Sequence, residues 1–341
     1  MTVFIDTSER LIVVLRAAAG RPDLEYARLP EALHGGFWAE LLSFSLAQPP
    51  DGWPAELVAR LMPDPRPAVK ETIVQRALAA AGYPTPRVRA SGGPDDGLGR
   101  AFMVMDRAPG RLGMPGLDGG LTLAAVLQVL QVPQLLATAM AQLHALDPDL
   151  VRGELAQVRE VPVTVSGLLA VYARLAGESR RPDLAGAAGW LAEHPPRPAT
   201  DVICHGDLHP FNLLADGSQV TVLDWSNALL APRAYDVGFT TLLLSEPPIR
   251  VPGWQRPLVR WFGRVLARRF VRGYRRRTTT MVEPGALRWY QAVVCLRALV
   301  EVAGWEHAGT ADTHAGHPFM VAGPAFARRL AALTGISVRP R

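Results

Sequence analysis

Cysteine and lysine are scarce in this sequence, which has only Cys204, Cys295 and Lys70 among its 341 residues. Two cysteines cannot cross-link a chain of this length, so a disulfide-stabilised secreted scaffold is excluded and a reducing, cytoplasmic location is expected. No apolar run reaches the ~18 residues of a membrane-spanning helix. The opening residues, MTVFIDTSERL, also lack the basic start of a signal peptide.

Glycine and proline, at 31 and 30 residues, are too few for a low-complexity chain. The length is about twice the ~150-residue prior for one domain, so two compact units with sizeable cores are expected. We place the boundary between residues 107 and 108, where the apolar segment AFMVMD gives way to APG.

Acidic residues are absent from one window, 250–277, which holds ten arginines. The whole chain has 36 basic and 31 acidic residues and a net charge of +5, so the chain outside this window has a net charge of −5. Arginines recur at every fourth position from Arg256 to Arg276 and form one stripe of a predicted helix. We take this stripe first as a solvated face. The alternatives are a surface for an acidic or phosphorylated substrate, an anionic membrane or nucleic acid.

The remaining periodicity indicates strands followed by helices. The first hundred residues predict strands, turns and a single helix at 68–81, with a hairpin formed by 41–47 and 56–62 and a further strand at 101–106. Apolar residues at three- and four-residue spacing then predict four more helices, while two Pro/Gly-rich stretches predict loops. The helices are expected at 124–146, 165–175, 257–274 and 286–305, and the loops near 180–198 and 309–323.

One β-rich segment, ICHGDLHPFNLLADGSQVTVLDW, contains most of the residues suited to chemistry. Asp216-Gly217 predicts a hairpin turn, and cross-strand pairing should make Asn212 and Asp224 neighbours at its open end. An amide oxygen beside a carboxylate suits Mg²⁺, which prefers oxygen ligands. Asp207 should face the same point, which would place a base beside a metal.

The order H-x-D-x-x-x-x-N, hairpin, D resembles the catalytic segment of the aminoglycoside phosphotransferase and choline kinase-like family of small-molecule kinases. AMAQLHALDP with His144 and LDWSNALLAPRAYDVG with Asp236 resemble family segments on either side. The match is colinear over residues 30–245. It implies an α+β, bilobal protein-kinase-like fold. Residues 1–107 would form a small antiparallel-sheet lobe that binds nucleotide, and 108–341 a larger, mainly helical catalytic and substrate lobe.

The resemblance also implies roles in phosphoryl transfer, where the protein mainly positions groups and neutralises charge. Asp207 would accept the proton of the substrate hydroxyl. Asn212 and Asp224 would hold Mg²⁺ on the phosphates of ATP or GTP. His205 and Asp236 would support the catalytic loop without touching the reacting atoms.

On the nucleotide side, LHGGFW resembles the phosphate-covering loop, so Gly35 and Gly36 would allow close backbone approach. LVARL resembles the strand that bears the basic phosphate contact, with Arg60 where protein kinases carry lysine. Glu71 would orient Arg60. The adenine ring would lie against Met105, Asp106 and Arg107.

These residues predict an ATP- and Mg²⁺-dependent kinase that transfers the γ-phosphoryl group to a hydroxyl of a small molecule. An antibiotic-inactivating phosphotransferase is the alternative within the same class. The basic C-terminal part argues against a polycationic aminoglycoside as the substrate. A pseudokinase that only binds is the alternative from another class. Substrate contacts are expected from Trp225, Glu301 and Trp305, and the oligomeric state is left open.

Overall fold

The computed structural model describes residues 2–33, 39–112, 123–159, 161–217 and 219–339. The chain divides into two compact units, each described here by itself. Unit 1 comprises residues 1–112, 149–161 and 213–227, and unit 2 comprises 113–148, 162–212 and 228–341. The predicted boundary after residue 107 falls just before the end of the first segment of unit 1. The functions given to the two predicted domains stay predictions.

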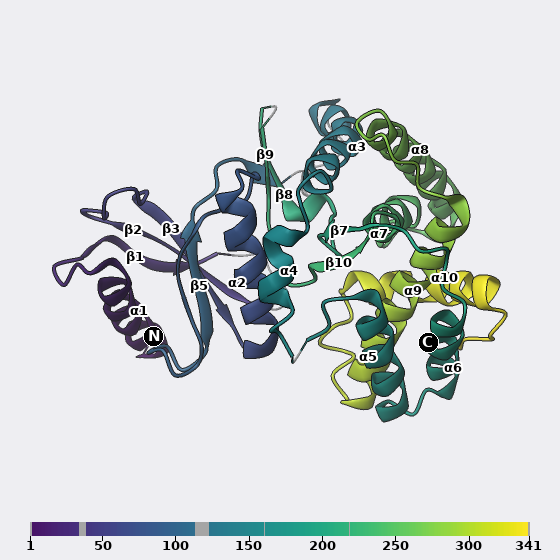
Figure 1. Cartoon of the computed structure of the whole chain (residues 1–341), viewed down its shortest axis with the longest axis horizontal. Helices are drawn as coiled ribbons and strands as arrows, with labels where there is room; N and C mark the ends of the chain where they lie inside the picture. Colours follow the sequence, from purple (N-terminus) through teal and green to yellow (C-terminus); the bar gives the residue numbers. More distant parts are fainter. Residues whose placement is uncertain (1, 34–38, 113–122, 160, 218, 340–341) are drawn as a thin grey trace. The chain divides into compact units, whose positions relative to one another are not determined.

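Unit 1 is built on a five-stranded antiparallel sheet with strand order β1-β2-β3-β5-β4 (Figure 1). A smaller sheet has the order β6-β8-β9. The strands are β1 (Tyr26–Ala32), β2 (Glu40–Leu46), β3 (Glu56–Met62), β4 (Val88–Gly92), β5 (Ala101–Asp106), β6 (Arg111–Leu112), β8 (Leu213–Asp216) and β9 (Gln219–Val222). The helices are α1 (Thr2–Ala19), α2 (Pro65–Ala80) and α4 (Asp149–Leu155).

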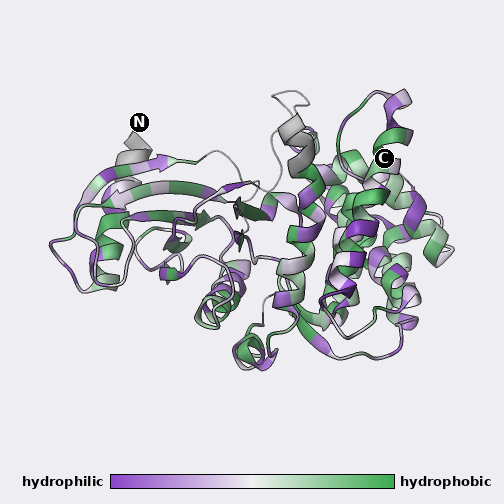
Figure 2. Ribbon diagram, turned by 90° about the horizontal axis from the view of Figure 1, so that it is seen from above, coloured by the Kyte–Doolittle hydropathy of each residue, from purple (hydrophilic) through white to green (hydrophobic). Residues whose placement is uncertain are grey.

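The predicted hairpin of unit 1 is confirmed, because β2 and β3 pair antiparallel from Glu40↔Leu61 to Ser45↔Glu56. Alternate residues of β3 are buried, as expected for a sheet with one face on a core. Figure 2 colours the ribbon by hydropathy and shows hydrophobic and hydrophilic residues mixed along it. The predicted helix at 68–81 corresponds to α2, which begins after the capping residue Asp64.

The expectation of a single helix in the first hundred residues was wrong. Helix α1 also lies there, and Leu11 and Leu15 pack in one core cluster with Leu42 and Phe44 of β2. Their four-residue spacing is that of one helix face, and burial against the sheet supplies the stabilisation.

The hairpin predicted at Asp216-Gly217 is present as β8 and β9, and Gly217 adopts a positive φ of 59°. Its ladder begins at the pair Leu213↔Val222, whereas Asn212 ends the short 3₁₀ helix η2 (Pro210–Asn212). Asp224 lies two residues beyond β9. The predicted cross-strand pairing of Asn212 with Asp224 was therefore wrong, because both residues lie outside the ladder.

Unit 2 is mainly helical, with one two-stranded sheet formed by β7 (Asp201–Cys204) and β10 (Leu229–Pro232). Its helices are α3 (Leu123–Leu143), α5 (Val165–Glu178), α6 (Pro182–Glu193), α7 (Ala234–Ser245), η3 (Gly253–Gln255), α8 (Arg256–Arg275), α9 (Pro284–His307) and α10 (Pro318–Thr334). The four helices predicted in this region correspond to α3, α5, α8 and α9. The loops predicted near 180–198 and 309–323 were partly wrong, because α6 and the start of α10 lie there. Pro182 and Pro318 occupy the first helical turn, where proline is well tolerated.

Helix α9 forms the centre of unit 2, and every residue from Tyr290 to Val300 is buried. Such all-round burial is typical of a core helix. Among the described residues, no helix is both long and apolar enough to span a membrane. The expected α+β class, with a small antiparallel sheet and a larger helical part, is confirmed.

Candidate active site

The HGD sequence of unit 2 forms a loop that follows β7, and helix α7 holds it on both sides of Asp207. Asp236, in the first turn of α7, accepts hydrogen bonds from the backbone N–H groups of His205 and Gly206, both at 2.8 Å. One turn later, the Thr240 hydroxyl donates to the carbonyl of Leu208 at 2.7 Å. The peptides before and after Asp207 are thus fixed to the same helix.

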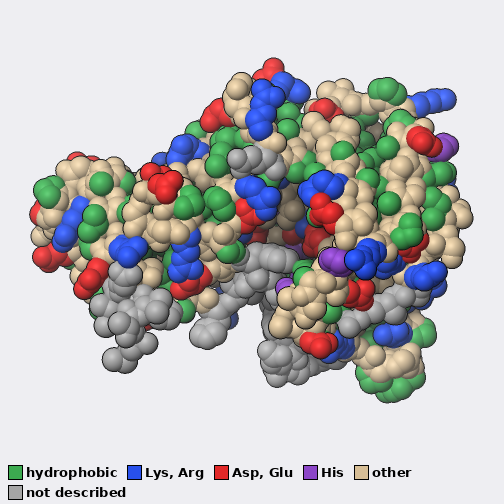
Figure 3. All heavy atoms as spheres, turned by 90° about the horizontal axis from the view of Figure 1, so that it is seen from below, with side chains coloured by type: hydrophobic (Ala, Val, Ile, Leu, Met, Phe, Trp, Pro, Cys, Tyr) green, Lys and Arg blue, Asp and Glu red, His purple; other side chains and the backbone are tan. Residues whose placement is uncertain are grey.

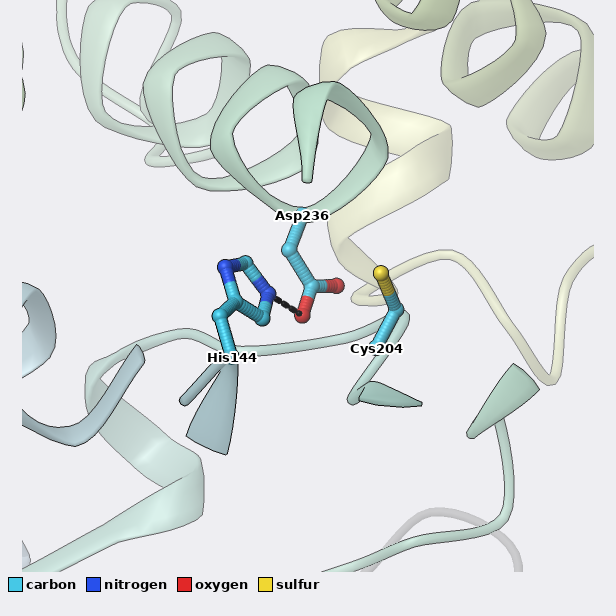
Figure 4. A group of neighbouring side chains, drawn as sticks. All are labelled: His144, Cys204 and Asp236. Atoms are coloured by element: carbon cyan, nitrogen blue, oxygen red, sulfur yellow. Dashed lines mark hydrogen bonds and ion pairs between the residues drawn. The ribbon is translucent and has the colours of Figure 1, made fainter. Parts of the chain in front are cut away.

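A buried chain of hydrogen bonds continues from Asp236 through His144 to helix α8, and Figure 4 shows its first link, between Asp236 and His144. The His144 Nε2 atom lies 3.2 Å from Asp236 Oδ2, and its Nδ1 atom lies 2.7 Å from the Tyr274 hydroxyl. Burial acts to raise the pKa of Asp236, but the hydrogen bond from His144 and nearby charges lower it overall. An ionised carboxylate only accepts, so Nε2 of His144 donates and, in the neutral ring, Nδ1 accepts from Tyr274.

Cys204 lies beside His144 and Asp236, and the potential ligand atoms of the three are within 4.8 Å of one another. Both oxygens of Asp236 already accept hydrogen bonds from the loop, so we interpret this cluster as a structural brace and not as a metal site. Burial raises the pKa of the Cys204 thiol well above its usual value. This environment disfavours the thiolate that nucleophilic catalysis would need.

Asp207 and Asn212 are brought together within unit 2. The Asn212 side-chain Nδ2 donates to the backbone carbonyl of Asp207 at 3.0 Å, which fixes the orientation of the amide. The backbone N–H of Asp207 donates to Nδ1 of His205 at 3.2 Å. The Asp207 carboxylate retains 20% exposure, so it remains open to a reacting group.

Sequence reasoning missed Arg297, the buried arginine of α9. Its Nη1 donates to the Gly206 carbonyl at 3.1 Å, and its Nη2 lies 3.9 Å from Oδ2 of Asp207. Its Nε donates to Glu301 Oε1 at 3.0 Å. A signal existed: Arg297 and Glu301 are the charged residues, four positions apart, of the otherwise apolar run AVVCLRALVEVA.

The predicted substrate residues Glu301 and Trp305 lie one turn apart on α9. Burial raises the pKa of Glu301, although Arg297 opposes that effect. The Trp305 ring stacks on His314, with centroids 4.4 Å apart, and meets His317 edge-on at 4.7 Å. Burial lowers the pKa of His317 to about 4, so this ring is neutral at pH 7. Substrate contact by Glu301 and Trp305 stays a prediction.

Unit 1 contains a second cluster of charges, formed by Arg60 of β3, Glu71 of α2 and Asp224. The Arg60 Nε atom lies 3.3 Å from Glu71 Oε1, and its Nη2 atom donates to Asp224 Oδ2 at 3.2 Å. Burial acts to lower the pKa of Arg60, but the two carboxylates raise it overall. The predicted partnership of Arg60 with Glu71 is thus present as an ion pair, and Asp224 joins it.

Asp224 adopts a left-handed backbone conformation with φ of 64°, which is uncommon for a residue with a side chain. Its Oδ1 accepts from the Ser226 hydroxyl at 2.6 Å and from the Ser226 backbone N–H at 3.3 Å. These bonds and the Arg60 contact hold the carboxylate in one orientation. Unusual backbone conformations supported in this way concentrate at functional sites.

The carboxyl group of Glu71 should make folding stability depend on pH. Burial, only partly offset by Arg60, raises its pKa from 4.5 to about 7. The folded chain therefore binds this proton more tightly than the unfolded chain. Its contribution to the free energy of unfolding is complete below about pH 4.5 and is lost as pH rises through about 7.

We expect Glu71→Gln to remove this dependence. Between pH 5 and 8, the free energy of unfolding of the variant should rise relative to wild type by about 2–3 kcal/mol, measured by urea denaturation. Glu56→Gln serves as a matched control, because Glu56 also pairs with an arginine, Arg107, but its side chain is exposed. A difference between Glu71→Gln and wild type that stays constant over this range would contradict the expectation.

The residues predicted to contact the adenine ring, Met105, Asp106 and Arg107, lie at and just after the end of β5. The Asp106 side chain pairs with Arg89, with Oδ2 at 2.9 Å from Nη2, and Arg107 pairs with Glu56 at 3.0 Å. Met105 is buried at the end of β5. The roles of these three residues stay predictions, and Gly35 and Gly36 lie outside the described residues.

The expectation that Trp225 contacts substrate is not supported. Its ring is fully buried, donates from Nε1 to Thr85 Oγ1 at 2.9 Å and packs edge-on against Tyr83. An indole satisfied in this way belongs to the core of unit 1. It anchors the segment that carries Asp224 and leaves no ring face for a ligand.

Several solved structures share the fold of this chain. A candidate aminoglycoside phosphotransferase from Ralstonia eutropha aligns with a TM-score of 0.65 and 18% identity, covering 96% of each chain. A thermostable mutant of aminoglycoside phosphotransferase APH(4)-Ia, in complex with ADP and hygromycin B, aligns with a TM-score of 0.58 and 19% identity over 92% of this chain and 97% of its own. A choline/ethanolamine kinase family protein from Mesorhizobium loti gives 0.56 and 18%, over 96% and 99%.

Among curated proteins, mouse acyl-CoA dehydrogenase family member 10 is 27% identical over 194 residues. This alignment covers 55% of the chain but only 18% of that relative, so the chain spans a small part of the mouse protein. The profile of the phosphotransferase enzyme family matches residues 43–290, well over half of the chain. Both the predicted fold and the predicted enzyme class are thereby confirmed: this chain is a member of the phosphotransferase enzyme family and has the kinase-like fold of the aminoglycoside phosphotransferases and choline kinase-like proteins.

Proposed function

We propose that this protein transfers the γ-phosphoryl group of ATP to a hydroxyl group of a small molecule, with Asp207 as the catalytic base. In this reaction the hydroxyl proton passes to Asp207 and the oxygen bonds to the γ-phosphorus. The bond between that phosphorus and the bridging oxygen breaks, which releases ADP. The work of the protein is then to orient the nucleophile and to balance charge.

The observation that carries the proposal is the set of hydrogen bonds by which side chains of α7 fix the backbone of the loop around Asp207. Asp236 holds the two peptides before Asp207, Thr240 holds the carbonyl after it, and the carboxylate itself stays partly exposed. Catalysis benefits from a base fixed before the substrate arrives, because no further ordering is then needed. A purely structural aspartate would have no need for open access.

The residues proposed to hold Mg²⁺ have suitable chemistry. Asn212 contributes an amide oxygen, since its nitrogen donates to the Asp207 carbonyl, and Asp224 contributes a carboxylate whose orientation Ser226 fixes. Mg²⁺ typically takes one or two carboxylates together with phosphate oxygens. When bound, the ion would neutralise charge on the phosphates.

The charges of unit 1 suit the phosphates of a nucleotide. Among the residues that the structure describes, the buried Arg60 Nε and Glu71 Oε1 atoms find no hydrogen-bond partner, although they attract each other as an ion pair. The Arg60 side chain as a whole retains 12% exposure, and a guanidinium group is suited to bind a phosphate oxygen. Glu71 and Asp224 hold its guanidinium in place. The ADP in the solved APH(4)-Ia complex supports a nucleotide ligand for this fold.

Phosphate transfer from γ-labelled ATP to a panel of hydroxylated metabolites and antibiotics tests the proposal. Antibiotics belong in the panel because the APH(4)-Ia complex contains hygromycin B. We expect a labelled product that requires Mg²⁺ and disappears with Asp207→Asn. Mg²⁺-dependent ATP binding without transfer to any acceptor would favour a binding module, and a chain that binds no nucleotide would refute the proposal.

A further inference from the structure

Helix α8 presents a basic face that the proposed reaction does not use. The helix packs inward against α3 and α7 (Figure 1), and its buried side chains include Leu266, Phe270 and Tyr274. The opposite face is solvent-exposed and rich in arginine. The exposed arginines of this face are Arg256, Arg260, Arg264, Arg268, Arg269, Arg272, Arg275 and Arg276.

Most of this positive charge is not balanced by neighbouring carboxylates. Glu246 pairs with Arg260, and within the described part of the chain it is the only carboxylate at ion-pair distance from an arginine of α8. Like charges four residues apart on a helix repel one another by a few tenths of a kcal/mol per pair. The stripe therefore destabilises the isolated fold slightly and is best explained by an anionic partner.

Large apolar side chains are exposed beside these arginines. Trp254 in η3 is 80% exposed, and Leu258 and Trp261 in the first half of α8 are 65% and 59% exposed. Leu258 and Trp261 are three residues apart, and Arg264 and Arg268 follow at similar spacing, so they share one side of the helix. An exposed indole beside a leucine suits a surface that offers both apolar and anionic groups.

The first half of α8 also borders a shallow groove of about 320 Å³. Arg256, Arg264 and Arg328 of α10 contribute positive charge to its lining, which also contains the Arg260–Glu246 ion pair, while Val259 and Pro324 contribute apolar surface. Guanidinium groups bind phosphate through paired hydrogen bonds. A groove with this lining matches a phosphate ester that carries apolar substituents.

We propose that the outward face of α8 binds the surface of an anionic phospholipid membrane. The arginines would contact lipid phosphates, and Trp254, Leu258 and Trp261 would enter the interface between headgroups and acyl chains. Nucleic acid is the less suitable partner, because its phosphate backbone offers no apolar layer for Leu258. On the molecular face shown in Figure 3, acidic and basic side chains are interspersed, so a single-sign surface is not general to this protein.

Co-sedimentation of the full chain with lipid vesicles tests this proposal. We expect binding to vesicles of phosphatidylcholine mixed with phosphatidylglycerol, little binding to phosphatidylcholine alone, and weakening with added salt. A basic residue near such a surface contributes about 1 kcal/mol, or about fivefold in affinity. Arg268→Gln with Arg272→Gln should therefore weaken binding by about 30-fold, and Trp261→Ser should weaken it further.

The matched control is Arg152→Gln with Arg174→Gln, which removes the same charge from exposed positions of α4 and α5. It should bind vesicles like wild type. Circular dichroism and thermal unfolding confirm that each variant is folded. Absence of binding to anionic vesicles, or an equal loss in the control, would overturn the proposal. Tighter binding to a double-stranded oligonucleotide, unaffected by Trp261→Ser, would assign the face to nucleic acid instead.

Discussion

Asp207→Asn should lower kcat for phosphate transfer by about 10²–10⁴-fold, while the affinity for nucleotide stays within a few-fold of wild type. Asparagine has the same shape but cannot accept the hydroxyl proton. The loop bonds to Asp236, Thr240 and Arg297 reach the backbone of residues 205, 206 and 208, so the substitution leaves them in place. The loss should therefore appear in kcat, measured by steady-state kinetics with the acceptor identified by the panel.

Asp216→Asn is the matched control for that experiment. Asp216 is the exposed last residue of β8, where it pairs with Gln219, and asparagine has the same shape and keeps the backbone pairing. Its kcat should equal that of wild type. If Asp207→Asn retained more than about a tenth of the wild-type kcat, Asp207 would not be the base.

Local patterns were sufficient to predict much of this fold. Helical periodicity located α2, α3, α5, α8 and α9, and Asp-Gly located the β8–β9 turn. These signals depend on residues close together in the sequence. Helices α6 and α10 were missed because proline was interpreted as a breaker, although it occupies the first turn of each helix.

The candidate site was predictable only where one short segment carries it. Asp207, Asn212 and Asp224 lie within eighteen residues of sequence, and the family resemblance pointed to all three. The supports of the loop come from far along the chain. Tyr274 bonds His144 across 130 positions, and Arg297 reaches Gly206 across 91. Spacing contains no information about such tertiary contacts.

Trp225 was predicted to belong to the site, but the structure does not support this prediction. A substrate contact was predicted for it, but the ring is fully buried, packs against Tyr83 and donates a hydrogen bond to Thr85. A residue next to a functional group in sequence can pack into the core, because the backbone conformation and tertiary contacts decide where its side chain lies, and Asp224 itself has a left-handed backbone.

Arg297→Met should reduce both stability and kcat, and the two losses should be separable. Methionine fills much of the volume of arginine but leaves Glu301 and Asp207 without their shared cation. Breaking a buried ion pair by removing one partner typically costs 3–5 kcal/mol, so we expect a loss of roughly 3 kcal/mol in the free energy of unfolding. The bond to the Gly206 carbonyl is also lost, so the peptide before Asp207 is held less firmly.

The double variant Arg297→Met with Glu301→Gln separates these effects. Neutralising Glu301 removes the carboxylate left without a partner, so much of the stability should return, as measured by urea denaturation. The bond to Gly206 and the charge near Asp207 remain absent, so kcat should stay low while KM for ATP is unchanged. Recovery of kcat together with stability would show that Arg297 only stabilises the core. Persistent loss of kcat in a stable double variant, with Glu301→Gln alone retaining the wild-type kcat, would identify Arg297 as the positioning residue of Asp207, because neither stability nor the loss of Glu301 could then account for it.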